Sequence, residues 1–217
     1  MVYIPPEPWL NIFYEDDYMI VVNKPCGLLS VPGRGNTPDK TDSVLTRVRK
    51  NHPAAESAHR LDLATSGVLT VALTKEVEIK LKDQFRRRRT YKFYIAKVWG
   101  HPTEDEGEIY LPIVKDWPNR PRSKVCYETG KPSMTCYKVL ERYEDSTSRL
   151  LLTPVTGRSH QLRVHLQAIG HPIIGDRFYA PQNVQSMAPR LLLHAETLCL
   201  SHPHFSTPFH AYCKADF

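Results

Sequence analysis

The stretch HRLDLATSG, residues 59–67, combines a carboxylate and a cation at a spacing that suits chemistry. Asp62 follows Arg60 by two residues, and Leu61 and Leu63 alternate with them. If the leucines anchor the segment on a core, Arg60 and Asp62 project together to the other side. A carboxylate beside a guanidinium stays ionised, and an ionised, half-buried Asp suits nucleophilic or base chemistry. A structural ion pair at a turn is the alternative interpretation.

A second cluster is RRRRTYKFY, residues 86–94, in which consecutive arginines precede aromatic side chains. Such a segment can clamp a phosphate backbone and stack bases. The alternative is a solvated helix end, where cations complement the helix dipole. Tyr94 shares a strand face with Ala96 and Val98, so it can equally be a core tyrosine. The predicted phosphate contacts are Arg86, Arg87, Arg88 and Arg89.

A third cluster is TGRSHQLRVH, residues 156–165. Arg158 and a capped helix start could bind an anion there. His160, Arg163 and Gln167 share one helix face, which is either a binding face or an ordinary polar one. A basic, Pro-rich loop, DWPNRPRSK at residues 116–124, adds further cations. From these two segments the candidate contacts to an anionic ligand, such as the phosphates of RNA, are Arg120, Arg122, Arg158 and His160.

Metal and cofactor chemistry find little support in the sequence. His194, His202 and His204 are not completed by a carboxylate or Cys pattern, so we expect no metal. Neither a Gly-rich nucleotide loop nor a Gly-x-Ser-x-Gly motif occurs. We therefore expect no cofactor.

The bulk properties are those of a globular protein with an anionic partner. The 217 residues carry a net charge of +6, which favours nucleic acid. The 5 cysteines form no C-x-x-C pair, and the N-terminus does not look like a signal peptide. No apolar run approaches the roughly 20 residues of a membrane span. We expect a cytoplasmic protein without membrane contact.

Turn signals and hydrophobic periodicity predict an α+β domain, with helices flanking a mixed, largely antiparallel sheet. Strands are expected over residues 10–14, 18–23, 67–73, 91–99, 108–113, 134–141, 149–154 and 191–200. Helices are expected from a cap at Asp42 or Ser43 to about Lys50, from Thr74 to about Arg89, and from Ser159 to Gly170. Residues 30–41 are expected to form a loop.

These stretches together resemble the RluA family of pseudouridine synthases, in that family's order along nearly the whole chain. HRLDLATSG resembles the family's catalytic motif. The other matching segments are YEDDYMIVVNKPCGLLSVPG (14–33), YKFYIAKVWG (91–100), GRSHQLRVHLQAIGHPIIGDRFY (157–179) and LLLHAETLCLSHP (191–203).

The resemblance implies a pseudouridine synthase catalytic fold and three catalytic residues. Asp62 would be the catalytic aspartate, which attacks the base, attacks the sugar or removes a sugar proton. Tyr94 would stack on the uracil, and Arg163 would be the ion-pair partner of Asp62. Arg60 would fill the space of the extruded uridine or hold a phosphate. The reaction is a redox-neutral isomerisation, which agrees with the absence of cofactor motifs.

The resemblance also implies the partners. The sequence of residues 116–133 closely resembles that of one family member, which modifies both 23S rRNA and a tRNA anticodon arm. Stem-loops of both RNAs are therefore the expected substrates. Only residues 1–13 precede the N-terminal landmark, so we expect a single catalytic domain over 1–217, without an S4-like domain, acting as a monomer.

Two rival functions use the same features. A non-catalytic RNA-binding protein would not need the Asp62 carboxylate. A base-releasing glycosylase could use that carboxylate at C1′ but would yield free uracil and an abasic site.

Overall fold

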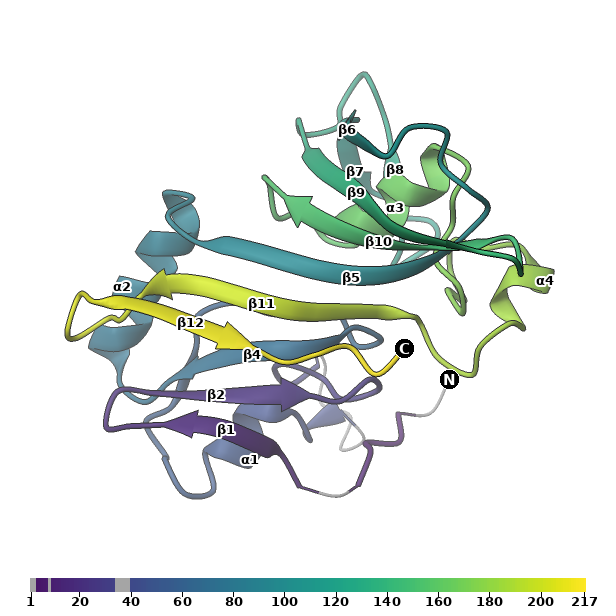
Figure 1. Cartoon of the computed structure of the whole chain (residues 1–217). Coiled ribbons are helices and arrows are strands. Elements are labelled where there is room, and N and C mark those ends of the chain that lie inside the picture. The colour runs from purple at the N-terminus through teal and green to yellow at the C-terminus, as the bar shows by residue number, and fades with distance from the viewer. Residues whose placement is uncertain (1–2, 8, 34–39) are drawn as a thin grey trace. The chain divides into compact units, whose positions relative to one another are not determined.

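The computed structural model describes residues 3–7, 9–33 and 40–217, and its strands outnumber its helices (Figure 1). Among the described residues, eight strand pairs have an antiparallel register. Together with the flanking helices, this confirms the predicted α+β class. None of the described helices combines the length and hydropathy of a membrane span.

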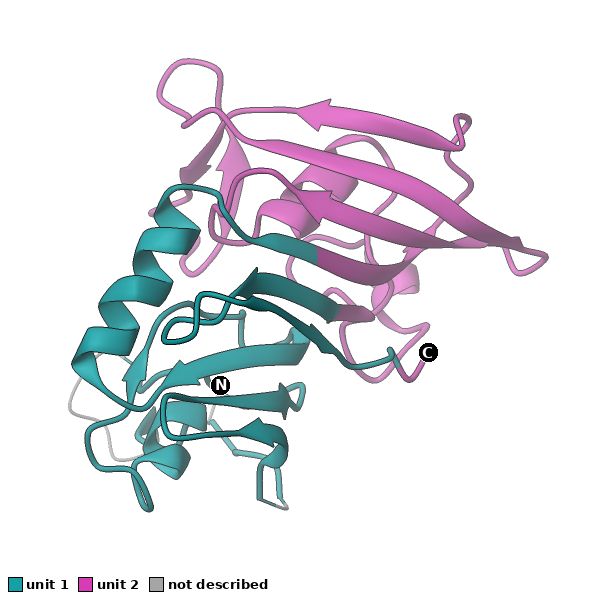
Figure 2. Cartoon of the chain, turned by 60° about the vertical axis from the view of Figure 1, so that its left-hand side comes forward, with its two compact units in different colours: residues 1–92, 195–215 teal, residues 93–194, 216–217 magenta. Residues whose placement is uncertain are grey.

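The chain divides into two compact units (Figure 2). Unit 1 comprises residues 1–92 and 195–215, and unit 2 comprises residues 93–194 and 216–217. The single domain expected over 1–217 stays a prediction.

Unit 1 is built around β4 (Ser66–Ala72), in which every residue is buried. This apolar run takes a central position, because both of its faces are covered. The strand order is β1 (Asn11–Glu15), β2 (Met19–Lys24), β4 and β11 (Leu193–Ser201), with β12 (Pro208–Tyr212) paired to β11 and β3 (Glu56–Ser57) paired to β4.

Two helices complete unit 1. α1 (Val44–Val48) is capped at its N-terminus by Ser43, whose side chain and that of Thr46 form a reciprocal capping box. α2 (Lys75–Arg86) is capped at its N-terminus by Thr74, whose hydroxyl accepts a hydrogen bond from the Val77 amide. Val77 and Leu81 bury the apolar face of α2 in a core with residues of β2, β4 and β11.

Unit 2 contains an antiparallel sheet in the order β5 (Tyr91–Trp99), β10 (Thr147–Pro154), β9 (Met134–Tyr143) and β6 (Glu106–Tyr110). β7 (Ile113–Lys115) and β8 (Ser123–Val125) form a separate hairpin. α3 (Gln161–Ala168) contacts β8, β9 and β10. The short α4 (Gln182–Gln185) adds Val184 to a second apolar cluster.

The predicted helices and strands are found, with differences at their ends. α2 ends at Arg86 rather than near Arg89, because Arg88 has a φ of 55°, outside the helical region. α3 begins after His160, which is left-handed and makes no side-chain cap, so the Ser159 cap was wrong. The strand expected over 108–113 ends at Tyr110 as β6, and the short elements β3, β7, β8, β12 and α4 were not predicted. Part of the expected loop, residues 34–39, lies outside the described residues.

Candidate active site

Asp62 lies in unit 1, on a loop that leads directly into β4. Residues 59–61 belong to no helix or strand, and a turn follows in which the Thr65 amide donates to the Asp62 carbonyl oxygen at 3.1 Å. Asp62 is half-buried, and Arg60 is exposed. Leu61 is buried but Leu63 is 43% exposed, so only one of the two leucines anchors the loop on the core. The turn interrupts the alternation that the prediction assumed.

The backbone on both sides of Asp62 is fixed by residues of the segment 24–30. The Ser30 hydroxyl donates to the Leu61 carbonyl oxygen at 2.8 Å and accepts from the Leu61 amide at 3.0 Å. The Gly27 amide donates to the Leu63 carbonyl oxygen at 2.9 Å. The segment 24–30 therefore holds the backbone of the Asp62 loop in place.

Lys24 is the charged group beneath this loop, and it is fully buried. Its ammonium donates to the carbonyl oxygens of Pro25, Leu28 and Leu63, at 2.9, 2.8 and 3.3 Å. Desolvation lowers the pKa of Lys24 to about 7, while the negative charges of Cys26 and Asp62 act in the opposite direction. Lys24 was not predicted as a site residue, because its partner Leu63 lies 39 residues away.

His59, three residues before Asp62, has a structural part in the same segment. Its Nε2 accepts a hydrogen bond from the Thr70 amide at 3.0 Å, and its ring lies 4.5 Å from that of Phe85. Desolvation, with a smaller effect of the Lys92 charge, lowers the pKa of His59 to about 3. His59 is therefore neutral at physiological pH and ties the loop to β4.

Unit 2 carries the other two predicted catalytic residues. Tyr94 is half-buried in β5, opposite Leu152 of β10. Arg163 is buried in α3, and its Nε and Nη2 donate to the two carboxylate oxygens of Asp176, both at 2.7 Å. Arg163 therefore does not lie on an ordinary, solvent-exposed polar face of the helix. Pairing of Arg163 with Asp62 and stacking by Tyr94 stay predictions.

Asp176 organises the surroundings of Arg163. Its Oδ1 also accepts from the amides of Phe178 and Tyr179, at 2.9 and 3.2 Å. The rings of these two residues lie 5.2 and 5.0 Å from the Arg163 Cζ. The guanidinium is thus held by a bidentate ion pair and two aromatic faces. Asp176 lies within the segment that resembles the family, but no role was predicted for it.

His160 connects α3 to the β7–β8 hairpin. Its Nδ1 lies 2.7 Å from the Tyr179 hydroxyl, which accepts a hydrogen bond from the Ser123 amide at 2.8 Å. His160 is 8% exposed, whereas Arg158 is exposed. The predicted RNA contacts of both residues stay predictions.

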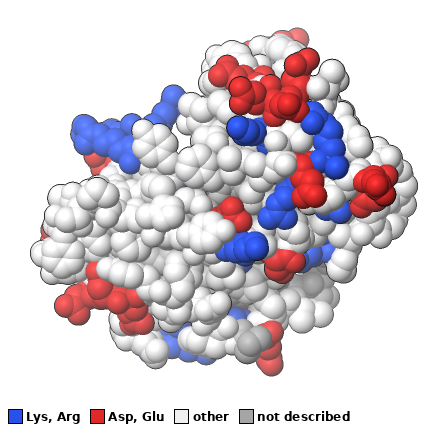
Figure 3. Space-filling view, viewed as in Figure 1, with Lys and Arg blue, Asp and Glu red and all other residues white. Residues whose placement is uncertain are grey.

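The remaining predicted RNA-binding residues lie at the surface. Arg86 and Arg87 both pair with Asp83, as side chains at a helix end often do. Figure 3 shows basic side chains gathered over the end of α2. All six arginines of the two basic segments are exposed: Arg86, Arg87, Arg88, Arg89, Arg120 and Arg122.

The histidine cluster of the C-terminal segment is structural in part. His202 is buried, and its Nε2 lies 2.8 Å from a carboxylate oxygen of Asp16. His204 stacks on Tyr18 with ring centroids 3.9 Å apart. Among the described residues, no group of His, Cys, Asp and Glu side chains is arranged to hold a metal ion.

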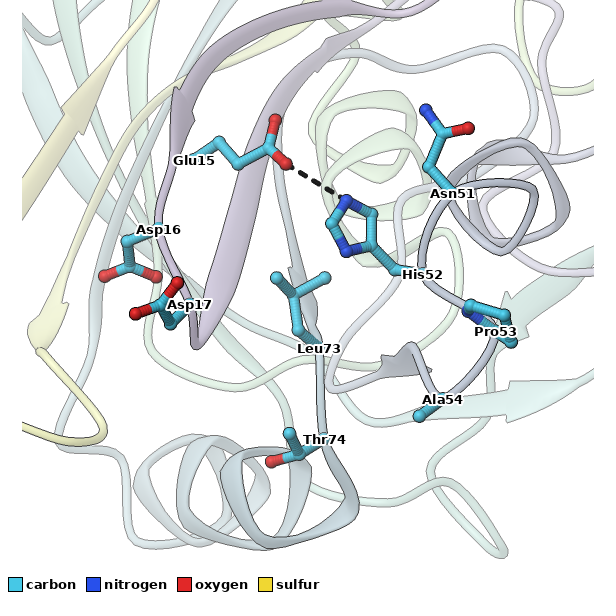
Figure 4. A pocket seen from close by; sticks show the side chains of 9 residues that line it. All are labelled: Glu15, Asp16, Asp17, Asn51, His52, Pro53, Ala54, Leu73 and Thr74. Atoms are coloured by element: carbon cyan, nitrogen blue, oxygen red, sulfur yellow. Dashed lines mark ion pairs between the residues drawn. The ribbon is translucent and has the colours of Figure 1, made fainter.

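A cavity of about 530 Å³ in unit 1 lies away from the predicted residues, none of which lines it. The side chains of Glu15 and His52 point toward each other across it, with 3.0 Å between carboxylate and imidazole (Figure 4). Asp16 and Asp17 add further carboxylates to its lining. An acidic lining repels phosphate, so this cavity is a poor candidate for RNA.

Comparison with known proteins defines the class of enzyme. Residues 18–168 match the family model of RNA pseudouridylate synthases. The chain belongs to this family, whose members are isomerases acting on RNA, as the sequence predicted.

The individual relatives cover almost the whole chain. The dual-specificity RNA pseudouridine synthase RluA of Escherichia coli K12 is 59% identical over 98% of this chain and 96% of the relative. The enzyme of the same name from Yersinia pestis is 59% identical over 95% and 99%. Human RNA pseudouridylate synthase domain containing 1 has a TM-score of 0.77 at 32% identity, covering 97% of this chain and 86% of that structure.

Proposed function

We propose that this chain converts uridine to pseudouridine in both 23S rRNA and the anticodon arm of tRNA, with Asp62 as the essential carboxylate. The observation that carries the proposal is the Asp62 loop, held by backbone contacts on both sides, in a chain 59% identical to an enzyme named for dual specificity. The cytoplasmic location, the monomeric state and the single catalytic domain expected from the sequence are parts of the same proposal.

The reaction needs few chemical groups. The N1–C1′ bond of the uridine breaks, the uracil turns, and C5 bonds to C1′. The proton on C5 is then lost and N1 gains one, so the product is an isomer of the substrate. No electrons are exchanged with an outside partner. An ionised carboxylate near C1′ and the ring suffices to start this sequence.

The proposed role of Asp62 is to act in its charged form, by attack on the base or the sugar or by removal of a sugar proton. Arg163 would keep the Asp62 carboxylate ionised and would orient it. The guanidinium of Arg163 is itself held in place by its ion pair with Asp176. Tyr94 would stack on the uracil. Phenols are weak bases at neutral pH, so this residue would be a poor acceptor for the final C5 proton.

The target uridine must leave its stack to reach the carboxylate, at a cost of a few kcal/mol. A hairpin-loop nucleotide is cheaper to extrude than a paired one, which favours stem-loop substrates. Arg60, exposed and two residues before Asp62, is proposed to fill the vacated space or to hold a phosphate. If Arg60→Ala left RNA affinity and turnover unchanged, this role would be abandoned.

The test is tritium release from RNA labelled at uracil C5, with Asp62→Asn as the variant. We expect wild type to release tritium from rRNA and tRNA stem-loops without free uracil. Asp62→Asn should bind RNA normally but lose turnover by about 1,000-fold or more, as expected for loss of a nucleophile or base. Asp17→Asn, which removes an exposed carboxylate of the same unit, is the matched control.

Each rival has its own outcome in this assay. An RNA-binding protein without activity gives no release, and Asp62→Asn then behaves as wild type. A glycosylase gives free uracil and abasic RNA. Comparison of tRNA and rRNA from cells with and without the gene then identifies the modified uridines.

A further inference from the structure

The hairpin of β7 and β8 presents an exposed tryptophan with an arginine stacked on it. Trp117 is 60% exposed. The guanidinium carbon of Arg120 lies 3.9 Å from the centre of the Trp117 ring. Arg120 was predicted to contact phosphate, but Trp117 has no assigned role. Trp99 differs from Trp117, because the indole of Trp99 packs against an apolar cluster of unit 2.

The loop that carries this pair is ordered by its own hydrogen bonds. The Asp116 amide donates to the Arg122 carbonyl oxygen, and the Arg122 amide donates to the Asn119 carbonyl oxygen, both at 3.0 Å. The Asn119 side chain donates to the Asp116 carboxylate at 2.9 Å. Since the loop is already folded, binding through it costs little conformational entropy.

The same loop is fixed to the segment that holds Arg163. The buried Ser123 donates its amide hydrogen to the Tyr179 hydroxyl, and the Tyr179 ring lies against the Arg163 guanidinium. Arg122 lies over the ring of Phe178, 5.7 Å from its centre. All these residues belong to unit 2. A ligand held by the loop is therefore held by the same rigid group of residues as Arg163.

The chemistry of the pair suits an unpaired base. Arg120 covers one face of the indole, and the exposed remainder offers a planar aromatic surface of the kind on which bases stack. In the loop, Arg120, Arg122 and Lys124 outnumber the one carboxylate, Asp116, which lies 3.7 Å from the Lys124 ammonium. An exposed aromatic ring on a loop of net positive charge matches the flat bases and the polyanionic backbone of single-stranded RNA.

We propose that Trp117 and Arg120 form a stacking platform for an unpaired base of the RNA substrate, distinct from the uridine that is isomerised. This inference rests on the proposed function and extends it to substrate selection. The platform favours RNAs whose loops place an unpaired base over Trp117, while Arg120 contributes a phosphate contact.

The test compares binding of a substrate stem-loop with binding of a fully paired duplex of the same stem sequence. We expect Trp117→Ala to weaken stem-loop binding about tenfold, which is the usual scale of one lost base stack. Duplex binding should not change, and Trp117→Phe should fall between wild type and Trp117→Ala. The turnover number at saturating stem-loop should stay that of wild type, so the loss appears in KM.

The chain provides a matched control in Trp9, which is also exposed and has the Lys50 ammonium 4.8 Å from its ring centre. Trp9→Ala should leave stem-loop binding unchanged. Stacking is read out separately by RNA-dependent quenching of tryptophan fluorescence, which Trp117→Phe should largely remove. Arg120→Gln should lower the slope of log affinity against log salt by about one, whereas Trp117→Ala should leave it unchanged.

Three results would overturn the platform. They are wild-type stem-loop affinity in Trp117→Ala, an equal loss for stem-loop and duplex, and an equal loss for heparin, a polyanion without bases. If wild type bound stem-loops but released no tritium from any RNA, the proposed function would fail. The binding comparison would still decide the platform.

Discussion

The carboxylate of Asp62 owes its place to backbone contacts made by residues far from it in the sequence. Ser30 holds the residue before it, and Lys24 and Gly27 hold the residue after it. The sequence could indicate Asp62 itself, because the motif is local and resembles a known family. It could not indicate the lysine beneath, because that contact exists only once residues 39 positions apart are folded together.

Lys24 leads to a prediction on stability against pH. Its pKa is about 7 in the folded chain and 10.5 in the unfolded chain. Between these pH values the unfolded chain binds more protons, so the free energy of unfolding rises with pH above about 7. The rise should be on the order of a few kcal/mol, and Lys24→Met should lack it. Urea denaturation of both proteins from pH 6 upward measures the difference.

The Asp62→Asn variant is the control for this assignment. The Asp62 charge raises the pKa of Lys24, so its removal should move the onset of the rise to lower pH. If wild type and Lys24→Met showed the same pH profile, the ammonium would not be the group responsible.

At the scale of elements, the helices and strands that were predicted well are those marked by a local sequence signal, such as a capping residue or an alternating pattern. Thr74 and Ser43 cap α2 and α1 as expected, and the bounds of β5 match the alternation of its residues. α3 begins one residue later than predicted, because His160 is held in a left-handed conformation beside Tyr179. The ion pair of Arg163 with Asp176 was also missed, since nothing local marks a partner 13 residues away.

Gly67, at the start of β4, gives a prediction for an element. Its φ is +114°, and an added Cβ would collide with the Ala195 carbonyl oxygen and lie 2.6 Å from the Ala195 nitrogen. Gly67→Ala must therefore displace β4 from β11 at the point where the Asp62 loop ends. We expect a loss of more than about 2 kcal/mol in the free energy of unfolding, measured by urea denaturation.

Gly170 provides the matched control for this substitution. Its φ is +87°, but an added Cβ would meet nothing within 4 Å. Gly170→Ala should cost only the conformational strain, about 1 kcal/mol. Equal losses for the two variants would mean that the contact between β4 and β11 does not decide the effect.

At the scale of the whole molecule, charge and fold class were the properties open to prediction. The net charge of +6 pointed to a polyanion, and the order of strands and helices pointed to an α+β class. The order of the strands could not be predicted from the sequence, because pairings such as that of β6 with β9 join segments that share no local pattern. The two compact units were also not foreseen, since β11 returns to unit 1 after a hundred residues of unit 2.

The arginines at the end of α2 allow the charge of the whole molecule to be tested through salt. Arg86 and Arg87 are engaged with Asp83, whereas Arg88 and Arg89 are exposed just beyond the helix. RNA affinity should fall steeply with salt, and replacing both Arg88 and Arg89 with Gln should lower the slope of log affinity against log salt by about two. Replacing Arg86 and Arg87 should lower it less, because Asp83 already compensates part of their charge. Filter binding of one stem-loop over a salt series measures these slopes, and affinity independent of salt would remove this basic segment from the RNA-binding surface.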